Sequence, residues 1–410
     1  MACSSDAEAP ILEDDETGNP MEDPTEESTD ESPNILLIIA DDMGLDATPG
    51  YNIGTIKPAM PNLEDMMRKG LTFNNLWSNP TCTPTRSAMI TGKYGFRTNV
   101  SAVGDELSIS ETSLQEYIRT NATANYSDAV IGKWHLSNDI NHPNNMGVGY
   151  FGGFSRGGVT SYTNWDFVEN GTSTATTVYA TTKITDVAID WIGNQSNPWF
   201  LWLAYNAPHT PFHLPPDELH NQGALPADES SISANPMPYY MAALEAMDTE
   251  MGRLLASMTD AERDNTIIIF IGDNGTPTQV AQAYGNRRTK DTPYQGGVNV
   301  PMVVSGNGVL RVNETEDALI TVTDLFTTVS ELAGVGVTEL NDSKSFKALL
   351  SGDSSNTREF AYTEIGRGGD TYDIAIRNQT HKYITFSDGS AELYDLIEDP
   401  LESQNLLSNT

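Results

Sequence analysis

Apolar runs and segments of helical periodicity alternate along the chain. Residues 34–40 (NILLIIA), 199–205 (WFLWLAY) and 266–271 (TIIIFI) are apolar almost throughout, which is typical of strands buried on both faces of a sheet. Two shorter strands are expected, one ending at residue 131 and one over 300–304. Helices are expected at 61–69, 183–192, 239–258 and 324–332. Strands that alternate with helices predict an α/β fold with a large mixed, mostly parallel sheet flanked by helices.

The pattern changes near residue 355. Short alternating strands with turn residues between them are expected at 360–364, 372–376 and 382–386, and they predict a small antiparallel sheet. The chain therefore divides into three expected parts. These are a segment 1–32, a main α/β domain 33–354 and a small C-terminal subdomain 355–410.

Charge excludes several classes of partner. The 410 residues contain 57 acidic and 22 basic side chains, a formal net charge of −35. Nucleic acid and anionic membrane surfaces are bound by basic patches, so neither is an expected partner. No apolar run approaches the roughly 20 residues that span a bilayer, so no transmembrane segment is expected. Residues 1–32 hold twelve acidic residues and no Lys or Arg, which predicts a disordered acidic tether.

The chain has two cysteines, Cys3 and Cys82, too few for a disulfide framework. No apolar signal region precedes Cys3, but the start MACSSD resembles the mature end of a bacterial lipoprotein. We therefore expect an exported, periplasmic or cell-surface protein of lipoprotein type, with an ordinary cytoplasmic start as the alternative. An acidic, tethered protein also suits a marine bacterium.

Polar residues follow three of the expected strands. Asp41 and Asp42 follow the first strand, Asp273 and Asn274 follow 266–271, and Asn206 to His209 follow 199–205. Each cluster alone is equally compatible with an ordinary turn. The carboxyl ends of parallel strands meet at one edge of a sheet, where ligands bind. The four acidic and amide side chains offer only oxygen atoms, which suits Ca²⁺ or Mg²⁺.

His209 and His213 have the spacing of a zinc pair on a helix. Pro208 and Pro211 do not allow a continuous helix there, so a zinc site is not expected.

Cys82 precedes Pro84 and a short expected helix that ends at Gly92. The start of a helix stabilises an anion, and Arg86, one turn on, can point to the same place. The alternative is a small buried cysteine with a packing role.

These residues also carry a family resemblance. CTPTR at 82–86 with TGK at 91–93 resembles the signature of the formylglycine-dependent type I sulfatases, in the alkaline-phosphatase-like superfamily. Further matches are GKWHL at 132–136, APHTP at 207–211, DNG at 273–275, Lys290 before YQGG at 294–297, and ELYDL at 392–396. The resemblance spans about residues 33–406. Thr85, Ser137 and Gln295 depart from the residues usual in the family.

The resemblance implies a mechanism. Cys82 is oxidised to formylglycine by a formylglycine-generating enzyme, and one hydroxyl of its hydrate attacks sulfur with Asp273 as the base. One Ca²⁺, or Mg²⁺, is held by four side chains: Asp41, Asp42, Asp273 and Asn274. The other implied catalytic residues stabilise the sulfuryl charge (Arg86, Lys133, Lys290), protonate the leaving alcohol (His209 or Lys290) and accept the proton of the second hydroxyl (His135).

The implied substrate is a sulfated carbohydrate of algal type, with a small aryl sulfate as the alternative. Candidate substrate contacts are His142, Arg156, Trp165, His213, Arg287 and Arg288. Two other activities remain open: a formylglycine-dependent phosphonate or phosphodiester hydrolase, and an inactive glycan-binding relative. A two-zinc phosphatase would need a histidine where Asn274 stands.

Overall fold

The computed structural model describes residues 32–285, 288–354 and 357–409. The tether predicted for residues 1–32 lies, except for Ser32, outside the described residues, as does Cys3. One large sheet dominates the described chain, in the order β10-β2-β9-β8-β1-β7-β3-β4-β5-β6, with β11 beside β2. Its strands are β1 Asn34–Ala40, β2 Gly70–Trp77, β3 Ser127–Lys133, β4 Tyr150–Phe154, β5 Trp165–Glu169, β6 Thr172–Thr176, β7 Trp199–Ala204, β8 Thr266–Gly272, β9 Asn299–Gly306, β10 Glu314–Glu316 and β11 Ile320–Thr321.

The centre of the sheet is parallel. β8, β1, β7, β3 and β4 run in one direction, and every residue of β1, β7 and β8 is buried. β9 runs antiparallel to both β8 and β2. The carboxyl ends of the five parallel strands therefore lie at one edge, which is the edge that carries the polar clusters.

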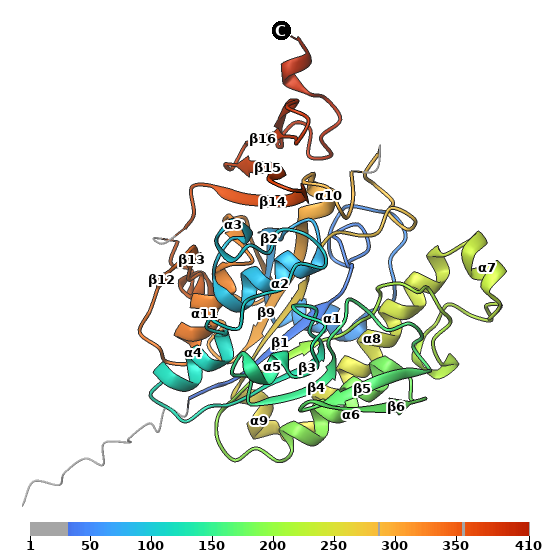
Figure 1. Ribbon diagram of the computed structural model, residues 1–410, viewed down its shortest axis with the longest axis vertical. Helices are drawn as coiled ribbons and strands as arrows, with labels where there is room; N and C mark the ends of the chain where they lie inside the picture. Colours follow the sequence, from blue (N-terminus) through green and yellow to red (C-terminus); the bar gives the residue numbers. More distant parts are fainter. Residues whose placement is uncertain (1–31, 286–287, 355–356, 410) are drawn as a thin grey trace, which may run out of the picture. The chain divides into compact units, whose positions relative to one another are not determined.

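Helices cover both faces of this sheet (Figure 1). One face packs against α2 Cys82–Thr91, α4 Leu114–Asn121 and α11 Asp324–Leu332. The other packs against α1 Pro61–Arg68, α6 Ala180–Ile192 and α8 Met237–Ser257. The shorter helices are α3 Gly95–Thr98, α5 His142–Asn145, α7 Glu229–Ala234, α9 Asp260–Asp264 and α10 Gln295–Val298, with 3-10 turns η1 Asp217–Leu219, η2 Lys347–Ser351 and η3 Leu406–Asn409.

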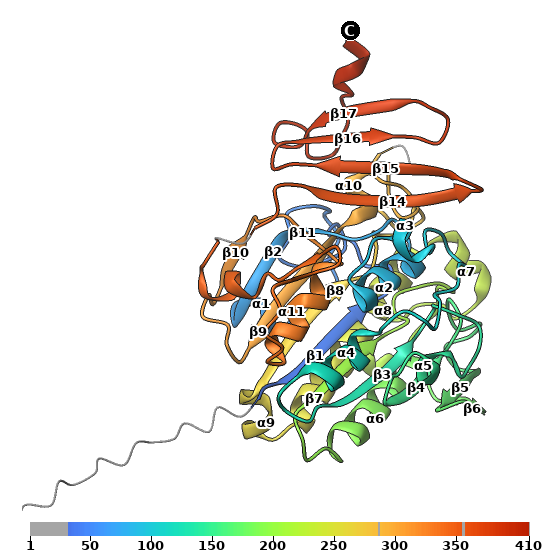
Figure 2. The same ribbon diagram turned by 60° about the vertical axis from the view of Figure 1, so that its left-hand side comes forward.

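Four antiparallel strands form a second sheet toward the end of the chain (Figure 2). They are β14 Ala361–Gly368, β15 Thr371–Arg377, β16 His381–Thr385 and β17 Ala391–Asp395. A two-stranded ribbon, β12 Glu339–Leu340 and β13 Ser343–Lys344, precedes them. The predicted fold class is confirmed. Within the part of the chain that the structure describes, no helix is long and apolar enough to cross a membrane.

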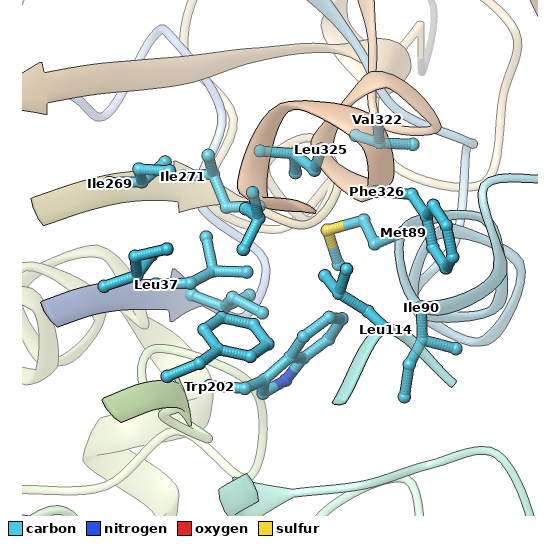
Figure 3. Packing of buried hydrophobic residues seen from close by; sticks show 14 of the residues in the cluster. Leu37, Met89, Ile90, Leu114, Trp202, Ile269, Ile271, Val322, Leu325 and Phe326 are labelled. Carbon is cyan, nitrogen blue, oxygen red and sulfur yellow. The ribbon is translucent and has the colours of Figure 1, made fainter. Parts of the chain in front are cut away.

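Helix α2 is fixed against the sheet by its apolar side chains. Met89 and Ile90 are fully buried and belong to the same cluster as Leu37 of β1, Ile269 of β8 and Phe326 of α11 (Figure 3). The left-handed Gly92 ends the helix, and a Cβ there would lie 2.9 Å from the Phe326 side chain. This packing holds the first residue of α2 at the polar edge of the sheet.

Candidate active site at the carboxyl edge of the sheet

The two acidic strand ends meet. The backbone N–H of Asp42 donates to Oδ1 of Asp273 at 3.1 Å, and Nδ2 of Asn274 donates to Oδ1 of Asp42 at 2.7 Å. These three residues and Asp41 are at most 1 % exposed. Residues more than 230 positions apart in the sequence therefore form one oxygen-rich cluster, as the pairing of β1 with β8 requires.

Two buried cations are paired with this cluster. Nη2 of Arg86 donates to Oδ2 of Asp273 at 2.8 Å, and Nη1 donates to the carbonyl of Lys133 at 2.9 Å. The ammonium of Lys133 forms an ion pair with Oδ2 of Asp41. Both cationic side chains are fully buried. Because α2 carries Arg86 and β3 carries Lys133, the cluster is closed by two different elements.

A second pair of groups lies at the more open side. Nζ of Lys290 is 2.6 Å from Oδ1 of Asp42, and Nε2 of His209 is 3.9 Å from Oδ2 of the same residue. Nδ1 of His209 lies 2.7 Å from the carbonyl oxygen of Thr210, which leaves Nε2 directed toward the acids. Lys290 and His209 are partly exposed, so they can contact a bound molecule.

Cys82 is the first residue of α2 and is 2 % exposed. The next residue, Thr83, places its hydroxyl 3.2 Å from Nε2 of His135. Nδ1 of His135 is buried and has no hydrogen-bond partner among the described residues. A Cβ on Gly157 would lie 2.6 Å from Nε2 of His135, so glycine there allows the loop after β4 to approach the imidazole.

Burial and charge shift several pKa values in this cluster. Burial and the neighbouring Asp41 carboxylate raise the pKa of Asp273 to about 6. Burial, together with Lys133 and Arg86, holds the pKa of His135 far below its ordinary value, so this imidazole is neutral. Burial raises the pKa of the Cys82 thiol. Burial opposes ionisation of Asp42, but Lys290, His209 and Lys133 together outweigh it, and the pKa of Asp42 is lowered.

The cluster fits a hard cation. Oδ1 of Asp41 and Oδ1 of Asn274 are buried and have no hydrogen-bond partner within the described residues. Unpaired buried oxygens are costly unless a ligand satisfies them. Ligand atoms of Asp41, Asp42 and His209 also lie within 4.8 Å of one another. Three carboxylates and one amide match the preference of Ca²⁺ and Mg²⁺ for oxygen.

A cavity of about 420 Å³ opens onto the cluster. It is lined by Asp42 and Lys290, and by Thr210, Pro277, Thr278, Gln279 and Asp291. Its walls are polar and carry hydroxyl and amide groups. A bound molecule of several rings can therefore reach Asp42 and Lys290 from solvent.

Two candidate substrate contacts instead lie in the core. His142 is 2 % exposed, its Nδ1 accepts a hydrogen bond from Trp134 Nε1, and its Nε2 is 2.8 Å from the carbonyl oxygen of Leu107. Trp165 is 5 % exposed, and its indole N–H donates to the carbonyl of Val178. The expectation for these two is corrected, because both rings have packing roles and leave no free nitrogen for a substrate.

The other candidates differ in their surroundings. His213 stacks on Tyr162 at 3.7 Å, and its ring nitrogens contact the Tyr179 hydroxyl and the Pro211 carbonyl. Arg288 lies over the rings of Tyr294 and Tyr394, facing the C-terminal sheet. Arg156 is exposed. Arg287 lies outside the described residues.

Some neighbours of the site were not expected from the sequence. Asp46 accepts a hydrogen bond from Thr276, whose hydroxyl in turn accepts from the backbone N–H of Gly44. This bridge ties the loop after β1 to the loop after β8. Asn206, which the sequence already placed after the strand 199–205, is buried with both amide atoms unpaired among the described residues. The only available sequence signal was that these polar residues stand within a few positions of strand ends.

Comparisons with known proteins bear on the family and the fold of the chain. A family model described as Sulfatase matches residues 33–335, and one described as N-sulphoglucosamine sulphohydrolase, C-terminal, matches 288–410. An uncharacterized sulfatase of Escherichia coli, YdeN, is 28 % identical over 77 % of this chain and 65 % of its own length. Human N-acetylgalactosamine-6-sulfatase is 28 % identical over 74 % and 62 %. The chain thus spans slightly less than two thirds of these relatives.

Two solved structures share the fold. The protein i-CgsB, described in complex with a neocarrahexaose, superposes with a TM-score of 0.80 at 23 % identity, covering 92 % of this chain and 89 % of that one. A protein described in complex with its substrate D-glucosamine-2-N,6-O-disulfate superposes with a TM-score of 0.77 at 20 % identity, covering 92 % and 94 %.

Proposed function

Because this chain belongs to the sulfatase family, we propose that it hydrolyses sulfate esters of a sulfated carbohydrate. The observation that carries the proposal is the meeting of three features in one buried cluster. These are Cys82 at the start of α2, an oxygen-rich group at two strand ends, and the cations Arg86, Lys133 and Lys290 paired with it. A sulfate ester needs a nucleophile and neutralisation of its negative charge, and this cluster offers both.

The metal is proposed to be Ca²⁺, with Mg²⁺ as the alternative, held by Asp41, Asp42, Asp273 and Asn274. When bound, it supplies a positive charge that polarises a sulfate oxygen and lowers the pKa of a nearby hydroxyl. It would also satisfy the unpaired oxygens of Asp41 and Asn274.

Cys82 is proposed to be converted to formylglycine by a formylglycine-generating enzyme. The hydrated aldehyde would supply one hydroxyl as the nucleophile and a second through which sulfate is expelled. Burial raises the pKa of the unmodified thiol, which makes the thiol a poor nucleophile here.

The chain's own residues then have separate tasks. Arg86 and Lys133 are buried and fixed by their ion pairs, so they are preorganised to hold the charge on the sulfuryl oxygens. Lys290 and His209 are partly exposed, and either can deliver a proton to the leaving alcohol. The imidazole of His135 is neutral, because burial and the nearby cations hold its pKa low, and it is proposed to accept the proton of the second hydroxyl. Asp273 is proposed as the base for the attack.

The carbohydrate part of the proposal rests on two supports. The cavity beside Lys290 carries hydroxyl and amide side chains in its lining, which suit sugar hydroxyls. Two structures of the same fold are described with carbohydrate ligands, a neocarrahexaose and a glucosamine disulfate. Because the net charge of −35 repels a polyanion at long range, attraction must be local, and Arg156 and Arg288 are candidates for it. Small aryl sulfates and phosphate or phosphonate esters are the competing substrates. An exported, lipoprotein-like location remains part of the proposal.

The test combines modification analysis with kinetics. Mass spectrometry of the peptide containing Cys82 should show formylglycine, and a screen of sulfated oligosaccharides and aryl sulfates should show release of sulfate. Cys82→Ser keeps a hydroxyl but cannot form the aldehyde, so turnover should fall by at least about 10³. Cys3→Ser is the matched control and should leave turnover unchanged. Sustained turnover by Cys82→Ser would overturn the mechanism, and an enzyme that releases no sulfate from any substrate would overturn the function.

A further inference from the structure

A second cavity lies apart from the candidate active site. It has a volume of about 460 Å³ and is bordered by Asn75 of β2, by Tyr284, Gln295 and Asn299, and by Gln379 and Thr380 in the turn between β15 and β16. We call it the Asn299 pocket. It thus lies between the main sheet and the C-terminal sheet, and no step of the proposed reaction uses it.

Its inner wall carries polar atoms without partners. The hydroxyl of Tyr284 and Oδ1 of Asn299 are buried, and neither has a hydrogen-bond partner among the described residues. The two residues are 8 % and 6 % exposed. Buried polar atoms are normally paired, and an unpaired one costs free energy. Because the Tyr284 hydroxyl and Asn299 Oδ1 belong to residues that line one cavity, they indicate that a bound polar ligand supplies their missing hydrogen-bond partners.

Among the residues that the structure describes, the lining of the pocket offers no free positive charge. Arg377 lines it, but its guanidinium already donates to the carbonyl of Asn378 at 2.9 Å, to Oδ1 of Asn75 at 3.0 Å and to the carbonyl of Gln379 at 3.2 Å. Asp317, also in the lining, adds a carboxylate. A sulfate or carboxylate group would therefore find no unpaired cation there. The guest that fits is uncharged.

The remaining lining has the two kinds of surface that sugars use. Leu396, Ile397 and Pro400 provide an apolar side, which can contact the C–H face of a pyranose ring. Asn75, Gln379 and Thr380 provide amide and hydroxyl groups on the other side, which can pair with ring hydroxyls. This combination of an apolar wall and convergent uncharged polar groups matches a hydroxyl-rich sugar unit.

We propose that the Asn299 pocket binds an uncharged sugar unit of a glycan. Its role in catalysis rests on the proposed function: it would hold a sulfate-free unit while a sulfated unit reaches Lys290. Gln295 of the pocket is five residues from Lys290 in the sequence. At no more than 3.6 Å per residue, their Cα atoms are at most about 18 Å apart. One oligosaccharide chain can span that distance.

Binding is measured with ligands that carry no sulfate, so the result does not depend on turnover. The probes are hexasaccharides prepared from chemically desulfated carrageenan and desulfated fucan, titrated into the full chain by calorimetry. We expect at least one to bind, and Tyr284→Phe to weaken that binding by about three- to tenfold, the effect of one lost hydrogen bond. Gln379→Ala should also weaken it. Tyr383→Phe, on an exposed tyrosine of β16, is the matched control and should bind like the parent.

A thermal unfolding scan of Tyr284→Phe shows whether weaker binding reflects unfolding of the variant. Removal of an unpaired hydroxyl should leave the unfolding midpoint unchanged or slightly higher. If neither hexasaccharide binds, or if Tyr284→Phe binds as tightly as the parent, the pocket is not a sugar site. If a hexasaccharide binds but no sulfate ester is hydrolysed, the proposed function fails and the pocket stands. If the enzyme is active, the variants should also lower kcat/KM on the sulfated polymer relative to that on a small aryl sulfate.

Discussion

A buried ion pair joins the C-terminal sheet to the chain segment that follows it, and breaking it should cost much of the stability. Nζ of Lys382 is 2.6 Å from Oε1 of Glu402, and both side chains are fully buried. Oε2 of Glu402 accepts the backbone N–H of Gln295 at 2.6 Å. Gln295 begins α10, whose Gly297 carbonyl accepts the N–H of Gly275, next to the candidate metal ligands.

The perturbation is Glu402→Gln, which keeps the shape and an oxygen for the Gln295 N–H but removes the charge. Lys382 then loses its counter-charge, and its Nζ has no further hydrogen-bond acceptor among the described residues. Even with Glu402 present, burial lowers the pKa of Lys382 to about 8, so the ammonium is already poorly stabilised. Removal of one partner from a buried pair costs about 3–5 kcal/mol, and we expect that loss in the free energy of unfolding.

The assay is equilibrium unfolding in urea followed by tryptophan fluorescence, since the Lys382 ammonium lies 4.9 Å from the centre of the Trp77 ring. Lys382→Met should lose a similar amount, because it leaves the carboxylate buried alone. The double variant Lys382→Met/Glu402→Gln contains neither charge and should recover most of the loss. If Glu402→Gln stays within about 1 kcal/mol of the parent, or if the two losses simply add in the double variant, the pair does not act as described.

Three further predictions follow from other parts of the molecule. Added Ca²⁺ should raise the thermal unfolding midpoint, and at a hundredfold excess over Kd the added free energy of unfolding should be about 2.7 kcal/mol. Asp41→Asn should abolish this rise in the midpoint. A larger rise with Zn²⁺ than with Ca²⁺ would contradict a site that selects for oxygen ligands. Burial raises the pKa of tyrosines such as Tyr51 and Tyr205 above their usual value near 10. Above pH 10 the folded state therefore binds more protons than the unfolded state. The free energy of unfolding should then fall as pH rises. Part of the phenolate absorbance should then appear only together with unfolding, and ionisation of all sixteen tyrosines in protein with unchanged circular dichroism would refute this. The ammonium of Lys57 lies within hydrogen-bond distance of four carbonyl oxygens in the loop after β1. Lys57→Met should therefore lower the free energy of unfolding, measured in urea, by about 1–3 kcal/mol. An unchanged unfolding transition would show that the loop does not need this ammonium.

The sequence predicted best where one physical factor dominates. The runs 34–40 and 266–271 are apolar on both faces, and only a buried strand accommodates that pattern, so the structure has strands there. Strand β2 was not expected, because Asn74 and Asn75 interrupt its pattern and its pairing with β9 is irregular between Phe73 and Leu76. A strand whose polar residues interrupt the alternation has no clear period, even when it has neighbours on both sides.

The sequence also shows which residues are near the site better than it shows their orientation. Strand ends located the acids of the cluster, because sheet topology brings such ends together. The rings of His142 and Trp165 were misassigned, since an aromatic residue in a loop or at a strand start can face the core or a cavity with the same local sequence. Burial of Lys382 had no signal at all, because its partner Glu402 lies twenty residues further on.

The order of strands in the sheet also determines how long Cys82 stays accessible during synthesis. Cys82 is closed off only when α2 is packed against a sheet that contains β8, and 184 residues separate Cys82 from Thr266, where β8 begins. At about 5–20 residues per second, the ribosome needs roughly 10–40 s to produce that stretch. For this interval the thiol lies in a chain that cannot yet form its core. An enzyme that modifies Cys82 must therefore act before α2 packs against the sheet that contains β8. A variant in which α2 packs sooner would leave less time for the modification.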